Sequence, residues 1–337
     1  MKTKCLSAIS LLALGLACAM PSQAQTAETA QPDERGTFSF VWENDWFGDQ
    51  DRNYTNGVRM GWLSKARPAQ SVDNFLADIL IDSEQDRQVR RGFALGHSIY
   101  TPTDIDETEF LPDQHPYAGY LYFEGTSVLE TEDSLDQISV RLGLIGPSAG
   151  GEWVQREFHS LIGAEIPEGW DNQVRDEVGI DVIYDRRLRA LLEFGDTDFG
   201  VDVIPNIGAT LGTLNTNARA GLTMRIGQDL KSDFGPPRVR PSLAGAGYFA
   251  PDSEFSWYLF AGAEGRYVAH DYILDGSLFR DDFRSITTKR EVLDLQAGLV
   301  VQYNGIQLGL TYVERTKQFE EQQEPQRFGA VSLSFKT

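Results

Sequence analysis

Large apolar residues recur at every second position in long stretches of this 337-residue sequence. The stretches 37–42, 138–144, 293–299 and 306–312 each alternate large apolar side chains with polar or small ones. This period of two is typical of β-strands, because successive side chains of a strand point to opposite faces of the sheet. Twelve stretches of this kind predict an all-β fold with strands near 37–45, 54–64, 91–99, 118–130, 136–145, 176–190, 199–212, 218–228, 256–269, 290–303, 305–316 and 327–335.

The number and length of these strands favour a membrane barrel. Twelve is an even number, and many of the stretches reach the length of about nine to eleven residues that crosses a bilayer at barrel tilt. The last stretch would place Val331, Leu333 and Phe335 in one lipid-facing row. Aromatic residues near strand ends are candidates for the girdles at the two membrane surfaces: Trp42, Trp62, Tyr120, Tyr122, Trp257, Tyr258, Tyr303 and Tyr312. We therefore expect a twelve-stranded antiparallel outer-membrane β-barrel that occupies residues 25–337 as a single domain.

The first 24 residues have the pattern of a secretory signal peptide. Lys2 and Lys4 begin it, an apolar run covers residues 6–20, and small residues precede a cleavage site after Ala24. An alternative is lipoprotein processing at Cys18. Cleavage after Ala24 would remove both cysteines, Cys5 and Cys18, so that no thiol remains for covalent catalysis. It would also change the formal net charge from −20 to −22, which argues against nucleic acid as a partner.

Alternation alone leaves a second fold open. A soluble β-sandwich or a water-soluble barrel alternates in the same way, with its apolar residues turned inward instead of outward. After residue 24, no stretch approaches the roughly 18 apolar residues of a spanning helix. An exported chain of this kind is therefore either soluble or a barrel. The long connections near 65–89, 100–117, 229–255 and 271–289 are polar or acidic, and we expect exposed loops there.

One segment breaks the strand pattern. Val154, Phe158, Leu161 and Ile162 recur at helical spacing after a glycine-rich start, which predicts a short amphipathic helix near 151–163, ended by Pro167 and Gly169. His159 follows Gln155 by four residues, so both side chains project from one side of this helix, and Glu165 lies near its end. Two interpretations stay open for His159: a general base at the mouth of the barrel, or an ordinary histidine on a polar helix surface.

A second polar group lies in the first predicted hairpin. Asn44 and Asp45 end one strand and Thr55 opens the next, so an antiparallel hairpin would bring the three side chains together. An acidic turn that is simply solvated explains the same residues. With four histidines and many carboxylates, the composition favours Ca²⁺ or Mg²⁺ over zinc if any metal binds.

Several motifs in the same order resemble the outer-membrane lipid A 3′-O-deacylase family. They are Glu43-Asn44-Asp45, the stretch 51–57, Ile99-Tyr100-Thr101-Pro102, Pro116-Tyr117-Ala118-Gly119, and the glycine-rich segment 146–151 followed by Gln155, His159 and Gly163-Ala164-Glu165. The resemblance covers essentially the whole chain after the signal segment, and the specific motifs concentrate in residues 40–170.

The resemblance implies a twelve-stranded outer-membrane barrel and Ca²⁺-dependent hydrolysis of the 3′-linked ester of lipid A. Carried over by position, His159 matches the histidine that activates water, and Asp45 and Glu165 match the acids of the calcium site. Asn44 and Thr55 match polar residues of the active site, and Gln155 is a further orienting residue. The implied partners are lipid A, as lipopolysaccharide, and outer-membrane lipid, and we expect a monomer.

The sequence departs from the family pattern where a phosphate would bind. A lysine that the family can place after the Ile99–Pro102 motif is absent, and acidic residues including Asp104 follow instead. His115 stands where an arginine commonly precedes Pro116. Arg90 and Arg91 are the candidates to compensate, and a less phosphorylated substrate is the alternative. Other functions that remain open are an outer-membrane phospholipase or other esterase, and a non-catalytic porin-like barrel.

Overall fold

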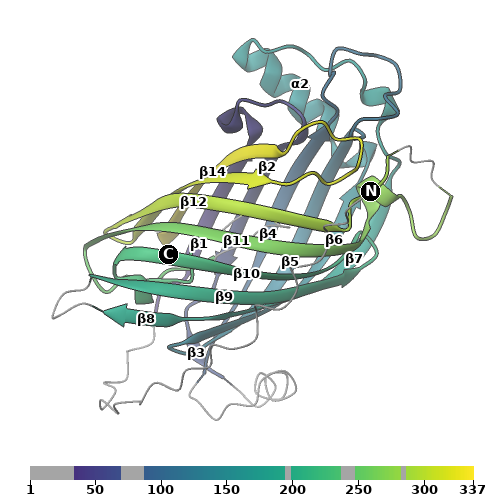
Figure 1. Ribbon diagram of the computed structural model, residues 1–337. Helices are drawn as coiled ribbons and strands as arrows, with labels where there is room; N and C mark the ends of the chain where they lie inside the picture. The colour runs from purple at the N-terminus through teal and green to yellow at the C-terminus, as the bar shows by residue number, and fades with distance from the viewer. Residues whose placement is uncertain (1–33, 70–86, 194–198, 237–246, 282–285) are drawn as a thin grey trace, which may run out of the picture. The chain divides into compact units, whose positions relative to one another are not determined.

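Twelve antiparallel strands form one closed ring in the computed structural model (Figure 1), which describes residues 34–69, 87–193, 199–236, 247–281 and 286–337. Each strand pairs with the next in order, and the ring closes where β1 pairs with β14. The two short strands β3 and β8 extend the sheet beside β4 and β9. The expected signal segment, with Cys5 and Cys18, lies outside the described residues.

The strands of the ring agree with the twelve predicted from alternation. Their bounds are β1 Thr37–Asn44, β2 Asn53–Leu63, β4 Gln88–Thr101, β5 Ala118–Glu130, β6 Ser134–Ile145, β7 Glu177–Leu188, β9 Phe199–Gly212, β10 Asn215–Gln228, β11 Phe255–Asp271, β12 Glu291–Tyr303, β13 Ile306–Arg315 and β14 Gln326–Lys336. The short strands are β3 Arg67–Pro68 and β8 Ala190–Glu193.

Helices occur in the connections between strands. The α-helices are α2 Gly151–Ile162 and α3 Tyr272–Asp275, and the 3-10 helices are η1 Asp45–Gly48, η2 Pro147–Ala149, η3 Trp170–Asn172 and η4 Leu230–Ser232. The predicted helix is thus confirmed as α2, but it ends at Ile162, before Pro167. Gly163, with φ of 71°, adopts the left-handed conformation that terminates it. None of the helices in the described ranges combines the length and apolar character needed to span a bilayer.

The orientation of the strand residues decides between a soluble and a membrane barrel. On β12, Leu293 and Leu295 are 40% and 50% exposed, whereas Asp294, between them, is 2% exposed. On β14, Leu333 and Phe335 are exposed and Ser334 is buried. Apolar side chains therefore cover the outer face, and polar side chains fill the lumen. That arrangement suits hydrocarbon around the barrel and is the reverse of a water-soluble barrel.

The girdle prediction is wrong for three of its eight aromatic residues. Tyr120, Tyr122 and Tyr258 are 7%, 1% and 0% exposed and lie on the lumen side of their strands. Their rings contact buried arginines there, as Arg141 does over Tyr122 and Arg225 over Tyr258. Alternation alone could not separate these three residues from the others, because aromatic residues occur on both faces of these strands.

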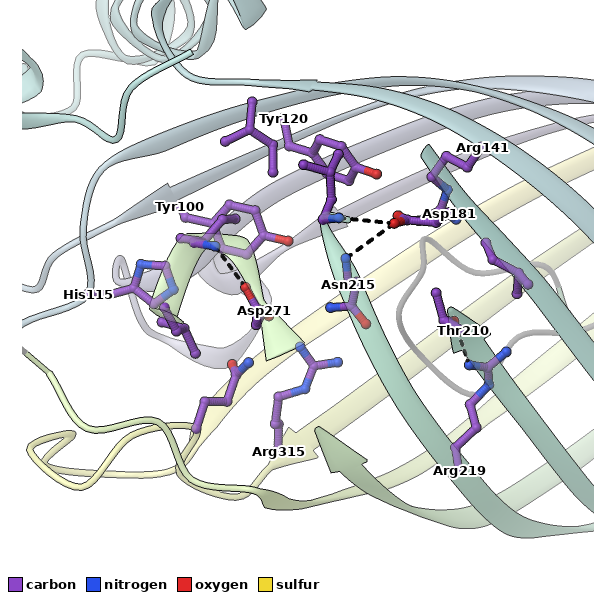
Figure 2. Close-up of a pocket in the computed structure, with 16 residues that line it drawn as sticks. Tyr100, His115, Tyr120, Arg141, Asp181, Thr210, Asn215, Arg219, Asp271 and Arg315 are labelled. Atoms are coloured by element: carbon purple, nitrogen blue, oxygen red, sulfur yellow. Dashed lines mark hydrogen bonds between the residues drawn. The ribbon is translucent and has the colours of Figure 1, made fainter. Parts of the chain in front are cut away.

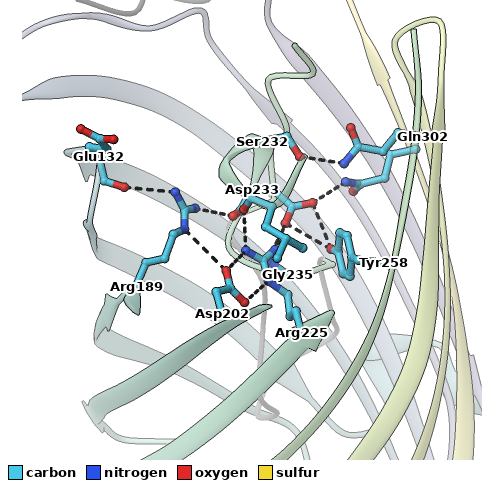
Figure 3. A network of polar contacts seen from close by, with 11 residues as sticks. Glu132, Arg189, Asp202, Arg225, Ser232, Asp233, Gly235, Tyr258 and Gln302 are labelled. Carbon is cyan, nitrogen blue, oxygen red and sulfur yellow. Dashed lines mark hydrogen bonds and ion pairs between the residues drawn. The ribbon is translucent and has the colours of Figure 1, made fainter. Parts of the chain in front are cut away.

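The loop after β10 enters the lumen instead of remaining exposed as predicted. Figure 3 shows Asp233, just after η4, among strand residues that bind it from several sides. Arg225 donates to Asp233 and to Asp202, the hydroxyl of Tyr258 donates to Asp233, and Arg189 donates to its backbone carbonyl. Further apolar residues of this connection are buried with it, namely Leu230, Phe234, Tyr248 and Phe249.

The opposite end of the barrel, where α2 lies, is filled in a similar way. Tyr272, Ile273 and Leu274 of α3 are 0%, 6% and 3% exposed. The Tyr272 hydroxyl donates to the carbonyl of Arg175, which ties this turn to the loop before β7. The expected exposed loop near 271–289 is therefore wrong at its start, because three consecutive apolar residues find a buried place inside the barrel mouth.

Arg225 tests how much the inward loop contributes to stability. Arg225→Ala would leave Asp202 and Asp233 as buried carboxylates without their main cation, which costs about 3–5 kcal/mol. We expect a clear fall in the temperature at which heating abolishes the compact, fast-migrating form of the protein in gel electrophoresis.

Arg327→Ala is the matched control. Its ion pair with Glu314 is 45% and 44% exposed on the two sides, so its loss costs about 0–1 kcal/mol. Equal shifts for Arg225→Ala and Arg327→Ala would contradict a stabilising role for the buried network.

Candidate active site on the outer face of the barrel wall

The outer face of the wall is covered near α2. On β4, Phe93 and Leu95 face outward and are 51% and 52% exposed. Ile99 and Thr101 lie further along the same face, yet they are 1% and 0% exposed. Ile99 packs there against Tyr117 and Trp170, from the segments before β5 and after α2. A patch of wall that would otherwise face lipid is therefore enclosed by protein.

Two glycines allow α2 to lie directly on this wall. Gly119 is on the outer face of β5, between lumen-facing positions. A Cβ atom on Gly119 would lie 2.8 Å from the backbone N of Gly151, the first residue of α2. A Cβ on Gly151 would lie 2.7 Å from Cα of Gly119. Only glycine at both positions permits this approach, which fixes where α2 begins.

The side of α2 that packs on the protein is mainly polar, although Val154 also packs there against Ile99, Tyr117 and Trp170. Gln155 and His159 are 2% and 6% exposed, whereas Phe158, Leu161 and Ile162 of the apolar stripe are 39%, 82% and 57% exposed. The prediction that Gln155 and His159 share one side is confirmed. The interpretation of His159 as an ordinary surface histidine is wrong, because that side faces the barrel wall.

The side-chain amide of Gln155 has a hydrogen-bond partner at its oxygen but none at its nitrogen among the described residues. Its Oε1 accepts a hydrogen bond of 2.9 Å from Nε1 of Trp170, which fixes the orientation of the amide. Its Nε2 is buried and has no hydrogen-bond partner among the described residues. A buried donor without an acceptor is costly, and such groups in native proteins call for an explanation.

The hydrogen bonding of His159 determines its tautomer. Nδ1 of His159 lies within hydrogen-bond distance of the backbone carbonyl of Glu165. A carbonyl oxygen only accepts, so Nδ1 carries the proton, and Nε2 of the neutral ring keeps its lone pair. In the part of the chain that the structure describes, Nε2 has no protein partner. The imidazole is therefore oriented and able to take up a proton at Nε2.

The carboxylate of Asp51 interacts electrostatically with both His159 and Glu165. Partial desolvation raises the pKa of Asp51, the negative charge of Glu165 raises it further, and the positive charge of protonated His159 opposes the rise. Desolvation, with a smaller contribution from Asp51, also raises the pKa of Tyr117 to about 12. Asp51, Glu165 and His159 thus form one electrostatic group over the covered wall.

Asp51 was missed as a site residue by the sequence reasoning. It lies in the 51–57 motif, but only its place in an acidic turn was recognised. Its nearness to His159 depends on how the β1–β2 turn and α2 meet, which the spacing of residues does not encode.

Asn44 and Asp45 hold the turn after β1. Oδ1 of Asn44 accepts a hydrogen bond of 2.8 Å from the backbone N–H of Trp46, and so caps η1. Asp45 is 1% exposed, and its Oδ2 accepts a 2.7 Å hydrogen bond from the backbone N–H of Arg52. Burial raises the pKa of Asp45 well above its usual value, and the charge of Asp51 adds to this rise.

A β-bulge places Thr55 on the outer face. The register between β2 and β4 shifts between Tyr54 and Asn56, which leaves Thr55 as the extra residue. Tyr54 faces the lumen, whereas Oγ1 of Thr55 is 2.7 Å from Oγ1 of Thr101 on the covered outer wall. Thr55 is 4% exposed. The predicted polar cluster is therefore assembled only in part: Asn44, Asp45 and Thr55 lie at one end of the hairpin, and each bonds to a different partner.

The predicted metal ligands are not arranged as a closed site. Within the described ranges, no three His, Asp or Glu side chains lie close enough together to hold a metal ion. The Glu165 side chain is exposed, and Asp51 interacts electrostatically with both Asp45 and Glu165. The donors nevertheless fit a hard cation in kind, because they are oxygen atoms and Asp45 is a buried carboxylate beside a second one.

A cavity of about 60 Å³ lies on the other side of the wall, inside the lumen (Figure 2). Charged side chains that line it are bonded to other groups of the protein. Asp181 accepts hydrogen bonds from the backbone N–H groups of Leu214 and Asn215. Arg219 pairs with Asp185 at 2.6 Å. This cavity is separated from His159 by the barrel wall, and we assign it a structural role.

Arg90 and Arg91 do not compensate for the missing phosphate ligands. They lie at the start of β4, whereas α2 packs beside the end of that strand. Arg90 is 1% exposed, pairs with Glu130 at 3.2 Å and stacks over Tyr248 inside the opposite end of the barrel. The sequence alone did not reveal at which end of the barrel these arginines lie.

Comparison with known proteins agrees with this architecture. The structure is similar to that of LpxR from Salmonella typhimurium, with a TM-score of 0.72 and 21% sequence identity over 89% of this chain and 99% of that one. The β-domain of the Bordetella autotransporter BrkA is a weaker match, with a TM-score of 0.44 and 9% identity over 90% of this chain and 100% of that one. No curated protein matches the sequence.

The sequence itself shows the family. The model of the family described as outer membrane protein LpxR matches residues 10–337, which is nearly the whole chain. The chain therefore belongs to the LpxR family of outer-membrane proteins, a family of lipid A deacylases.

Proposed function

We propose that this protein hydrolyses the 3′-O-linked acyloxyacyl ester of lipid A at the covered patch of its outer wall. The observation that carries the proposal is the buried imidazole of His159, whose Nδ1 is bound to the Glu165 carbonyl and whose Nε2 has no partner among the described residues. A base in this position is useful only for a substrate that reaches the outside of the barrel. Lipids of the outer membrane meet that condition.

His159 acts as the general base in this mechanism. Nε2 takes a proton from a water molecule as the water oxygen bonds to the ester carbonyl carbon. The tetrahedral intermediate then breaks its bond to the sugar oxygen, and Nε2 returns the proton to that oxygen. The products are the free acid and a sugar hydroxyl. The carboxylate of Asp51 stabilises the transient imidazolium by its charge.

Polar groups beside His159 complete the proposed site. The unpartnered Nε2 of Gln155, one helical turn away, is a donor suited to the oxygen that becomes negative in the tetrahedral intermediate. Asn44 holds the β1–β2 turn, and Thr55 holds the end of β2 against β4, so both orient the site.

Asp45 and Glu165 are the proposed ligands of Ca²⁺. Burial and the neighbouring Asp51 raise the pKa of Asp45, so the ionised carboxylate is costly in the folded protein. A bound divalent cation would offset this cost. When bound, Ca²⁺ supplies positive charge that polarises the ester carbonyl.

The alternatives differ in substrate or in activity. A phospholipase would use the same lipid-facing site on another ester, so only substrate comparison separates it from a deacylase. A porin-like function is disfavoured by the loop after β10 and by α3, which both occupy the lumen.

The first test is mass spectrometry of lipid A from a heterologous Gram-negative host. We expect the wild-type protein to remove one acyloxyacyl unit and His159→Ala to reduce this activity by at least about 100-fold, because general-base catalysis contributes about 10²–10⁴-fold. Glycerophospholipids from the same cells should keep their acyl chains.

His270→Gln is the matched control, because His270 is also buried, bonds through Nε2 to the Thr213 carbonyl and lies outside the site. It should retain activity. A His159→Ala protein that folds as a barrel and still deacylates lipid A would remove His159 from this role.

The second test concerns Asp45 and calcium. Because the folded-state pKa of Asp45 is raised, ionisation of Asp45 destabilises the folded state as pH rises above the unfolded pKa of about 3.9. Without calcium, Asp45→Asn should therefore be more heat-resistant than the wild type at pH 8, and the difference should vanish toward pH 4. Added calcium should raise the stability of the wild type more than that of the variant.

Asp49→Asn provides the comparison, since Asp49 is an exposed acid in the same turn, with a φ of 55° that asparagine also adopts readily. It should behave like the wild type at both pH values. A pH-independent difference for Asp45→Asn, or an equal response of all three proteins to calcium, would argue against Asp45 as a calcium ligand.

A further inference from the structure

A second polar cavity, of about 340 Å³, lies beside the candidate site. Three segments form its walls: Arg52 and Asn53 of the β1–β2 turn, residues of the loop 103–115, and residues of the loop 319–324. The backbone N–H of Arg52 donates to Asp45, so the cavity and the site share this turn. None of the seven residues assigned above to the reaction is among its described lining residues.

The lining of this cavity is strongly acidic. Asp104, Asp113, Glu321 and Glu324 contribute four carboxylates. A hydrogen bond from the Thr287 backbone lowers the pKa of Glu321, and a hydrogen bond from Arg52 lowers that of Glu324, so both are ionised at neutral pH.

The positive charge in the lining is already engaged. Arg52 is the one Lys or Arg among the lining residues that the structure describes, and its Nη2 lies 2.7 Å from Glu324. The guanidinium is thus directed to a carboxylate of the protein. Bidentate arginine contacts are a usual way to bind phosphate. Nη2 of the one arginine in the described lining is already paired with Glu324, and only its buried Nε has no hydrogen-bond partner among the described residues.

Neutral hydrogen-bonding groups are also present. Asn53 is 3% exposed, and its side-chain amide has no hydrogen-bond partner in the described part of the chain. Thr103 lines the same space. Gln114 and Gln322 line it too, but their amides are already bonded within the two loops, to Asp104 and to the Glu324 carbonyl. Amides and carboxylates together offer the donors and acceptors that sugar hydroxyls require.

We infer that this cavity is a subsite for the hydroxyl-bearing sugar head group of the substrate and disfavours a phosphomonoester. The inference rests on the proposed function, since it concerns the head group of the same lipid. A phosphate dianion in the cavity would face several ionised carboxylates at short range, whereas a hydroxyl would meet hydrogen-bonding partners without repulsion.

In bisphosphorylated lipid A, the sugar carbon next to the 3′ ester carries a phosphate. A subsite that rejects this phosphate selects lipid A from which it is absent. A reaction that hydrolyses that phosphomonoester therefore has to precede deacylation by this protein.

Binding tests the subsite independently of turnover. His159→Ala protein in detergent micelles is offered an equimolar mixture of bisphosphorylated lipid A and lipid A without the 4′ phosphate, and the bound lipid is identified by native mass spectrometry. We expect at least about a fivefold excess of the form without the 4′ phosphate, reduced at high ionic strength. Wild-type hydrolysis at fixed calcium should show the same preference.

The outcomes separate the two proposals. Equal binding, or a preference for the bisphosphorylated lipid, overturns the subsite inference even if the protein proves to be a deacylase. Selective binding without hydrolysis of either lipid by the wild type supports the subsite and rejects the proposed function.

A charge substitution gives a second measurement. Asp113 is exposed, lines the cavity and has no hydrogen-bond or ion-pair partner among the described residues, so Asp113→Lys should fold normally. We expect it to reduce the preference against the 4′ phosphate about fivefold. Glu254→Lys makes the same charge change on an exposed residue at the other end of the barrel. Equal effects of the two substitutions would overturn the inference.

Discussion

Hydrocarbon around the barrel is the constraint on which the rest of the structure depends. Polar side chains on the outer wall are costly in lipid, so the strands carry leucine, valine and phenylalanine outward and arginine, aspartate and glutamine inward. Chemistry with polar groups is possible on the outside only where protein replaces lipid as the neighbour. The close contact of Gly119 and Gly151 provides this cover, because it lets α2 lie directly on the wall.

The cover also explains the unusual arrangement of α2. A helix on the surface of a soluble protein buries its apolar stripe, but α2 turns Gln155 and His159 toward the wall and leaves Leu161 and Ile162 exposed. Such exposed apolar residues suit contact with lipid, as in an amphipathic helix that lies at a membrane surface. The same amphipathic pattern therefore has the opposite orientation from the one that holds in water.

Much of the fold was predictable from the sequence, and less of the site. Alternation identified the twelve strands, because period two is a local property of each strand. The inward course of the loop near Asp233 was not predictable, since it depends on Arg225 and Tyr258 from distant strands. The family resemblance made His159 a candidate, but its burial and the nearby charge of Asp51 follow from how loops meet in space. Simple alternation would place Thr55 on the lumen side of β2, but the bulge turns its side chain to the outer face.

The position of the site follows from what the lumen already contains. Buried ion pairs such as Arg315 with Asp294, and the loop residues around Asp233, occupy the interior and stabilise the closed barrel. An ester held in the outer membrane approaches from the side, and its acyl chains remain in hydrocarbon while its head group stays at the surface. In the proposed reaction, His159 on the outer wall, next to the polar cavity at the barrel mouth, would meet such a molecule without drawing its acyl chains through water.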